Sequence, residues 1–195
     1  MKANILRQET AHAGFFELRR LTVEHDLFAG GTTEPLVHEV LHRSNVAAAI
    51  LYDPATDEVV LTEQYRSGAH LAGVDPWLVD IVAGRIDPSE SALDAIEREI
   101  REESGLSPHK VELIGEFLTA PHLSSEKVFL HCATVNSAQA GGLHGIAHEG
   151  EDIRVMVMPR AEAVLLPQSR PLSLWAALAL NWLAHGTARE AAAVR

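Results

Sequence analysis

One stretch decides the fold and the chemistry expected of this chain, and it reads Gly84-Arg-Ile-Asp-Pro-Ser-Glu-Ser-Ala-Leu-Asp-Ala-Ile-Glu-Arg-Glu-Ile-Arg-Glu-Glu-Ser-Gly-Leu106. It predicts a helix on which Glu99, Glu102 and Glu103 are neighbours, because residues three and four apart share a helix face. Like charges at that spacing repel, so a positive partner is expected among them. Hard divalent cations favour clustered oxygen ligands and also hold phosphates. The stretch therefore predicts a metal-binding helix and a substrate that contains phosphate.

The limits of this helix are marked in the sequence. Asp87-Pro88-Ser89 has the residue types of a helix start, and Gly105 suits the left-handed position that ends a helix. Leu93, Ile96 and Ile100 recur at helical spacing, so we expect them to form the buried stripe.

Composition excludes several classes of protein. The chain has 195 residues, enough for one domain and an accessory element, and its net charge of −11 argues against binding to a nucleic-acid backbone. Cys132 is the only cysteine, so we expect a buried thiol and a reducing, cytoplasmic location, and the N-terminus lacks a signal-peptide core. The longest apolar run, 172–184, is shorter than the roughly 20 residues that span a bilayer, so no membrane partner is expected.

The remaining sequence predicts an α/β fold with a mixed sheet. Residues 14–41 alternate apolar and polar positions around Gly30-Gly31, which predicts a small antiparallel β element. Further strands are expected at 46–52, 58–64, 77–82, 111–119, 127–135 and 152–159, with a last helix at 172–184. The expected domains are an N-terminal, dimerising β element at 1–43, a main domain at 44–187 and a tail at 188–195.

The decisive stretch also resembles a known sequence motif, the Nudix box. The matching positions, at fixed gaps, are Gly84, Glu90, Arg98-Glu99, Ile100, Glu102-Glu103, Gly105 and Leu106. Residues 63–66, 121–126 and 142–155 resemble the ADP-ribose pyrophosphatase branch of that family. The resemblance implies a Nudix-type α/β/α sandwich and Mg²⁺-dependent hydrolysis of ADP-ribose to AMP and ribose 5-phosphate, with Mn²⁺ as a possible substitute. It also implies a homodimer in which the N-terminal β element is exchanged or packed against the partner.

Site residues follow from the helix and from the resemblance together. The expected metal ligands are the carbonyl of Ala83 and the carboxylates of Glu99, Glu102, Glu103 and Glu151. The resemblance makes Glu149 the general base, and Glu102 is the second residue expected to act in catalysis. Substrate contacts are expected from Arg66, Glu126, His38 and Phe15. Gly84 and a charge pair between Glu90 and Arg98 are expected to fix the junction of loop and helix.

Four alternatives remain open at this point. The substrate could be another nucleoside diphosphate sugar, such as GDP-mannose, or the chain could bind nucleotide sugars without hydrolysing them. His144 and His148 are four residues apart and could bind zinc, although the glycines around them argue against a helix. The acidic residues could also form no more than a solvated helix face.

Overall fold

A computed structural model describes residues 1–193, without the side chains of Glu149 and of residues 187–193. The chain divides into two units. The first consists of Met1–Asn45 and Leu118–Lys127, and the second contains Val46–Phe117 and the chain from Val128 onward. None of the helices described up to residue 193 has the length and hydropathy that a membrane span needs.

The first unit carries a three-stranded antiparallel sheet in the order β1-β2-β3. Its strands are β1 (Ala3–Ala13), β2 (Glu17–His25) and β3 (Leu36–His42). The expected hairpin is β2 with β3, and Gly30 and Gly31 in its loop have φ angles of 89° and 83°, which favour glycine. No separate strand was expected at β1 within the β element, because its side chains follow no apolar pattern, and all of its residues except Glu9 are exposed.

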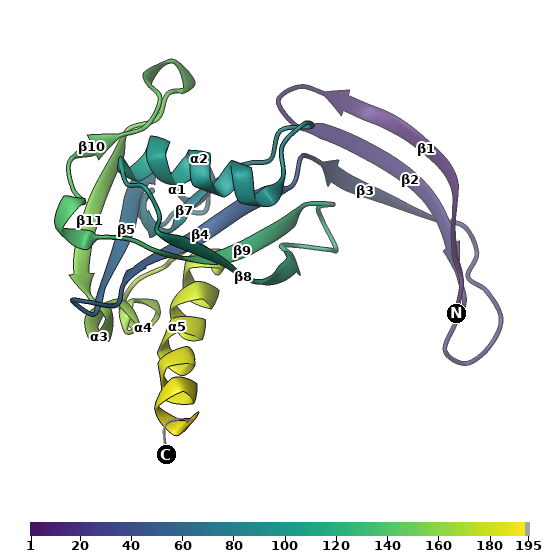
Figure 1. The fold of residues 1–195 in the computed structure, drawn as a ribbon. Coiled ribbons are helices and arrows are strands. Elements are labelled where there is room, and N and C mark those ends of the chain that lie inside the picture. The colour runs from purple at the N-terminus through teal and green to yellow at the C-terminus, as the bar shows by residue number, and fades with distance from the viewer. Residues whose placement is uncertain (194–195) are drawn as a thin grey trace. The chain divides into compact units, whose positions relative to one another are not determined.

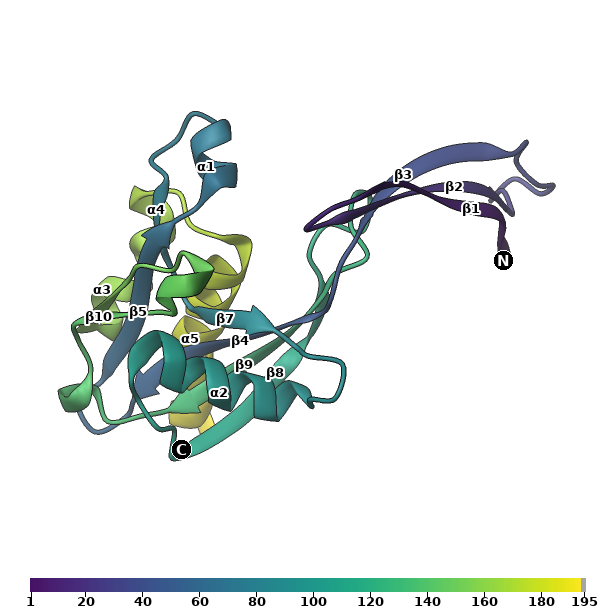
Figure 2. The ribbon, with the colours of Figure 1, turned by 90° about the horizontal axis from the view of Figure 1, so that it is seen from above.

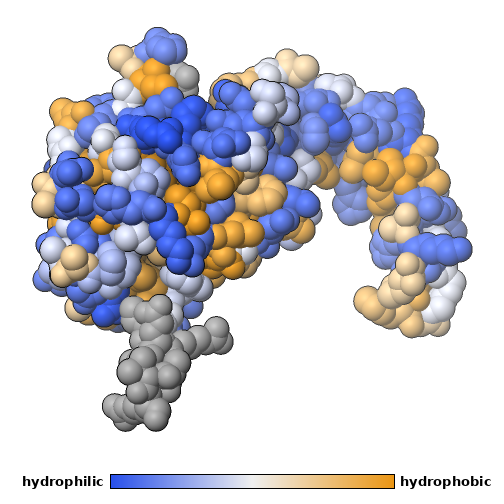
Figure 3. Space-filling model, in the orientation of Figure 1, coloured by the Kyte–Doolittle hydropathy of each residue, from blue (hydrophilic) through white to orange (hydrophobic). Residues whose placement is uncertain are grey.

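Apolar side chains on this small sheet remain exposed. Ile5 pairs with Val23, and Val23 pairs with Leu36, so the three side chains form a row across one face. Ile5 and Leu36 are both exposed, and Figure 3 shows apolar residues gathered on this part of the molecule. A small sheet with one uncovered apolar face has little core of its own.

The second unit contains an eight-stranded mixed sheet, in the order β10-β11-β5-β4-β9-β8, with β6 paired to β5 and β7 paired to β4. Strands β4 and β9 run parallel, whereas the pairs β10–β11, β11–β5, β5–β4, β4–β7 and β5–β6 are antiparallel. The strands are β4 (Val46–Asp53), β5 (Glu58–Tyr65), β6 (Trp77–Asp80), β7 (Val82–Arg85), β8 (Lys110–Leu118), β9 (Lys127–Thr134), β10 (Leu143–His144) and β11 (Ile153–Pro159).

Helices cover both faces of this sheet (Figures 1 and 2). Val46, Ala48 and Ile50 of β4 pack in one apolar cluster with the C-terminal helix α5 (Leu174–Ala193). The alternate β4 residues 47, 49 and 51 pack in a second cluster with α2 (Ala92–Ser104). Because side chains of a strand alternate between faces, β4 is buried on both sides. This is the expected α/β/α sandwich.

Short helical segments complete the second unit: α1 (Ser67–Leu71), α3 (Arg160–Ala163), α4 (Leu166–Ser169), and the 3₁₀ turns at Ser137–Gln139 and Ala147–Glu149. The expected strand 77–82 is interrupted, because residues up to Asp80 pair with β5 whereas those from Val82 pair with β4. Of the expected tail, residues 188–193 continue the backbone of α5, and 194–195 lie outside the described residues.

Two details of the predicted helix were wrong. Its N-cap is Ser91, whose hydroxyl oxygen accepts from the backbone N–H of Asp94 at 3.1 Å, whereas Asp87-Pro88-Ser89 lies in the preceding loop. Leu93 is 46% exposed, and Ala95 takes its place in the buried stripe beside Ile96 and Ile100. Because the helix begins at residue 92, Leu93 lies in its first turn and points toward solvent. Gly105 ends the helix with a φ of 70°, as expected.

Candidate active site

The packing of α2 brings a carboxylate into the interior of the second unit. Ile96 and Ile100 are fully buried, and Glu103 continues their stripe at helical spacing, with only 2% of its surface exposed. The backbone N–H of Ala83 donates to Glu103 Oε2 at 3.1 Å. In an antiparallel pair, the N–H and C=O of a residue point to the same side, so the Ala83 carbonyl shares the strand edge that faces Glu103.

The buried carboxylate of Glu103 is only partly compensated by its neighbours. Burial raises its pKa to about 8, and the charges of Glu99 and Glu151 act in the same direction. The Ala83 N–H and the positive charge of Arg66 act against this shift. Burial is therefore the main cause of the raised pKa, and the two nearby carboxylates add to it.

Gly84 makes room for the second carboxylate. A Cβ on Gly84 would lie 1.8 Å from Glu99 Oε1, closer than any two such atoms can approach. Gly84 lies within strand β7 and has no positive φ, so its lack of a side chain serves space and not backbone conformation. Burial raises the pKa of Glu99, and Arg98 partly offsets this shift.

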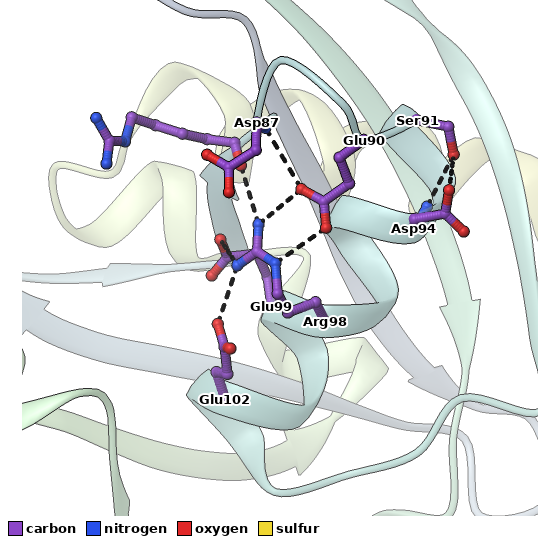
Figure 4. Close-up of polar contacts among 8 residues, drawn as sticks. Asp87, Glu90, Ser91, Asp94, Arg98, Glu99 and Glu102 are labelled. Atoms are coloured by element: carbon purple, nitrogen blue, oxygen red, sulfur yellow. Dashed lines mark hydrogen bonds and ion pairs between the residues drawn. The ribbon is translucent and has the colours of Figure 1, made fainter.

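Arg98 joins the loop before α2 to the acidic residues on it (Figure 4). Its Nε and Nη2 each donate to a different oxygen of Glu90, both at 3.0 Å, and Nη2 also donates to the carbonyl of Arg85 at 3.1 Å. Its Nη1 donates to Glu99 at 2.6 Å and to Glu102 at 3.0 Å. The bidentate pair of Arg98 with Glu90 lowers the pKa of Glu90. Its two parallel hydrogen bonds fix the direction of the guanidinium, as the expected structural role requires.

The expected ligands do not stand in a metal-binding geometry. Among the side chains that the structure describes, no three acidic, histidine or cysteine groups are arranged to hold an ion. Arg98 provides the reason, because its guanidinium pairs with both Glu99 and Glu102. The chemistry of the donor set nevertheless fits a hard divalent cation, since carboxylates and a strand-edge carbonyl supply oxygen only. The space that Gly84 leaves beside Glu99 is part of that fit.

The segment from residue 141 to 151 lies against the end of α2. The backbone N–H of Gly145 donates to the carbonyl of Glu102 at 3.3 Å, and Glu151 Oε2 accepts from the N–H of Ile146 at 3.0 Å. Glu151 also raises the pKa values of Glu99 and Glu103, which places its charge within reach of both. The side chain of Glu149 is outside the described residues. His144 Nε2 contacts the carbonyl of Gly141 at 2.8 Å, and among the described side chains no third ligand joins His144 and His148 as a zinc site would need.

Arg66 is held by Asp80, a residue to which the sequence analysis assigned no role. Arg66 Nη2 lies 3.2 Å from Asp80 Oδ2, and Asp80 is 2% exposed. A charged residue inside the apolar run 77–82 was the available signal, because an isolated buried carboxylate needs partners.

The other expected substrate residues lie in the first unit. Phe15 and His38 are exposed. Glu126 is buried, with Arg43 Nε 2.6 Å from its Oε2 and the Thr119 hydroxyl donating to its Oε1 at 3.0 Å. Arg43 was not expected from the sequence. The Arg43 side chain holds Glu126 in an ion pair within the first unit.

Comparison with known proteins adds to this geometry. The NUDIX domain family model matches residues 41–183. The ADP-ribose pyrophosphatase of Escherichia coli strain K12 is 37% identical over 180 residues, which cover 92% of this chain and 86% of that protein. The GDP-mannose pyrophosphatase of Cronobacter sakazakii is 30% identical over 166 residues, which cover 84% and 85% of the two chains. A crystal structure of an ADP compounds hydrolase shares the fold, with a TM-score of 0.70, 22% identity and 97% coverage of both chains.

Proposed function

The chain belongs to the Nudix family, and we propose that it hydrolyses the pyrophosphate bond of ADP-ribose to give AMP and ribose 5-phosphate. The observation that carries this proposal is the buried acidic cluster of Glu99 and Glu103, packed against β7 with the charge of Arg66 within reach. Such a cluster suits a cation that bridges it to an anionic substrate. The choice of ADP-ribose as the substrate rests on the similarity to the ADP-ribose pyrophosphatase of Escherichia coli.

The cation that we propose is Mg²⁺, with Mn²⁺ as a substitute. Glu99, Glu103 and the Ala83 carbonyl would hold it, with Glu102 and Glu151 adding oxygen ligands. When bound, a divalent cation lowers the pKa of a water molecule and offsets charge on the phosphates. Glu99 and Glu102 must then exchange their bonds to Arg98 for the ion, whereas Glu90 keeps the guanidinium in place.

The residues of the chain supply the other steps. Arg66 binds a phosphate oxygen of the substrate, as a guanidinium suits phosphate geometry. Glu149, in the segment that lies against α2, accepts the proton of the attacking water. Phe15, His38 and Glu126 are proposed to contact the nucleotide, and Glu126 must then give up its ion pair with Arg43.

We further propose a homodimer formed through the small sheet of the first unit. The row Ile5, Val23 and Leu36 supports this, since an exposed apolar face of that kind is typical of an interface. A cytoplasmic location remains a prediction from the single, buried cysteine, whose pKa burial raises to about 11.

A panel of nucleoside diphosphate compounds tests the proposed function. With Mg²⁺ present, ADP-ribose is expected to release AMP and ribose 5-phosphate, and a chelator is expected to stop the reaction. Turnover of GDP-mannose far above that of ADP-ribose would favour the second candidate, which the more distant pyrophosphatase relative represents. Binding of ADP-ribose without any product would favour a non-catalytic module.

A second pair of measurements tests the role of the carboxylates. Glu103→Gln is expected to lower kcat by a factor on the order of a hundred or more, because it removes a ligand charge from the site. Glu97→Gln is the matched control, since Glu97 lies on the same helix and pairs only with Arg101 in the described contacts. Its kcat is expected to stay at the wild-type value. Unchanged kcat in Glu103→Gln would contradict the metal-binding role.

A further inference from the structure

Asp80 is a buried carboxylate whose two oxygens have different partners. Oδ1 accepts from the backbone N–H of Ile81 at 2.9 Å and from the hydroxyl of Ser173 at 2.5 Å. Oδ2 contacts only Nη2 of Arg66 among the described bonds, at 3.2 Å. One oxygen thus serves the fold, and the other holds an arginine.

The partners of Oδ1 are structural. Ile81 is the residue at which the chain passes from pairing with β5 to pairing with β4. The Ser173 hydroxyl also accepts from the backbone N–H of Ala176 at 3.1 Å, at the start of α5. These bonds explain why the carboxylate can be buried, since a buried charge is tolerated when it is paired and hydrogen-bonded.

The partner of Oδ2, Arg66, lies near enough to the candidate active site for its charge to act there. Arg66 follows the last residue of β5, and its N–H donates to the carbonyl of Pro76 at 2.7 Å, so its backbone is fixed. Its side chain is about one-third exposed, and its positive charge acts on Glu103. A guanidinium has five N–H donors, so one bond to Asp80 fixes its direction and leaves donors for a ligand.

We propose that Asp80 is a positioning residue for substrate binding, which holds the Arg66 guanidinium where it meets a phosphate of the substrate. This inference rests on the proposed function, because it assigns that phosphate to a nucleoside diphosphate compound. A guanidinium that is fixed before binding loses less conformational entropy when the substrate arrives. Asp80 acts through Arg66 and does not itself touch the substrate.

The test is Asp80→Asn, which separates the two oxygens. The asparagine oxygen can still accept from Ile81 and Ser173, but its NH₂ group cannot accept from Arg66. KM for ADP-ribose is expected to rise on the order of tenfold, with kcat within about twofold of wild type, because a ground-state contact is weakened. Asp80→Glu returns a carboxylate, and its KM is expected to recover to within about threefold of wild type.

Two further variants show whether the effect passes through Arg66. Ser173→Ala removes the other side-chain partner of Asp80, so it is expected to lower Tm and leave KM unchanged. Arg66→Gln is expected to raise KM on the order of tenfold or more, and Asp80→Asn should add nothing in that background.

The outcomes distinguish this inference from the proposed function. A wild-type KM in folded Asp80→Asn, an equal KM rise in Ser173→Ala, or additive effects with Arg66→Gln would each overturn the role of Asp80. If Asp80→Asn does not fold, Arg66→Gln with a wild-type KM overturns it. Failure of the wild-type protein to hydrolyse ADP-ribose contradicts the proposed function instead, and KM is then measured with the compound of the panel that is turned over. If no compound is turned over, both proposals fail.

Discussion

Gly84 leaves the space that the Glu99 carboxylate fills, so a substitution of Gly84 tests whether the position of Glu99 matters for catalysis. In Gly84→Ala, the added Cβ would lie 1.8 Å from Glu99 Oε1, so the carboxylate must move. The strand backbone is not strained by alanine, because Gly84 has no positive φ. We expect kcat to fall on the order of a hundredfold, since a displaced catalytic group has costs of that size, while Tm changes little.

Gly186→Ala is the control for this substitution. Gly186 lies in α5, and nothing stands within 4 Å of an added Cβ. Alanine in a helix interior is expected to stabilise the protein by about 1 kcal/mol and to leave kcat unchanged. Steady-state kinetics and thermal denaturation measure both variants. Wild-type kcat in Gly84→Ala would show that the position of Glu99 does not matter.

Asp53 carries a pH dependence that can be separated from the active site. Its carboxylate accepts from the backbone N–H groups of Ala55 at 2.9 Å and Ser137 at 2.8 Å, and these bonds lower its pKa. The charged form is therefore favoured in the folded state. Its contribution to stability is full above the ordinary aspartate pKa of about 4 and is lost as pH falls through the lowered value.

Thermal denaturation across this range tests the prediction. Wild-type Tm is expected to fall as pH drops below about 4, and Asp53→Asn is expected to have a lower Tm at neutral pH with a shallower fall. Parallel curves for the two proteins would show that Asp53 does not titrate with folding.

Helix α2 begins at Ala92, directly after its N-cap Ser91, and the two serines near its start offer a matched pair. Ser91→Ala removes the cap on Asp94, so it is expected to destabilise the protein by about 1 kcal/mol. Ser89→Ala changes an exposed loop residue and is expected to leave Tm unchanged. Equal losses in both variants would contradict the observed helix start. Denaturant unfolding at neutral pH measures the free energy of unfolding of both variants, and thermal denaturation measures their Tm.

The α2 region also shows what local sequence can and cannot predict. The spacing of Glu99, Glu102 and Glu103 and the end at Gly105 followed from helix geometry and were found as expected. The start was not, because Ser89 and Ser91 are both suitable caps. In the structure Ser91 caps the helix, and Glu90 between the two serines is held by Arg98. A local pattern fixes the type of an element more firmly than its first residue.

Contacts between residues far apart in the chain could not be predicted from the sequence. Asp80 meets Ser173, 93 residues away, and no spacing along the chain indicates that bond. The pairing of Arg98 with both Glu99 and Glu102 was also unforeseen, although Arg98 was expected to pair with Glu90. Mixed α/β architecture could be predicted because strands with alternating or apolar patterns are interleaved with two long helices along the chain. The tertiary partners of single polar side chains could not.

For the whole molecule, the apolar row of Ile5, Val23 and Leu36, in which Ile5 and Leu36 are exposed, predicts association through one face of the small sheet. Light scattering at micromolar concentration is expected to give the mass of a dimer. Ile5→Glu is expected to give a monomer, because it places a charge in the row. Val37→Glu is the control on the opposite face, since neighbouring strand residues alternate, and it should remain dimeric. A monomeric wild type would contradict the proposed interface.

Seating of a divalent cation between α2 and β7 is the claim on which the proposed chemistry depends. The direct measurement is an anomalous difference map from crystals soaked in Mn²⁺ with a non-hydrolysable ADP-ribose analogue. We predict a peak bounded by the carboxylates of Glu99 and Glu103 and the carbonyl of Ala83, with Arg98 still bonded to Glu90. A saturated crystal with no peak at that place, and with Glu99 still bonded to Arg98, would contradict the account.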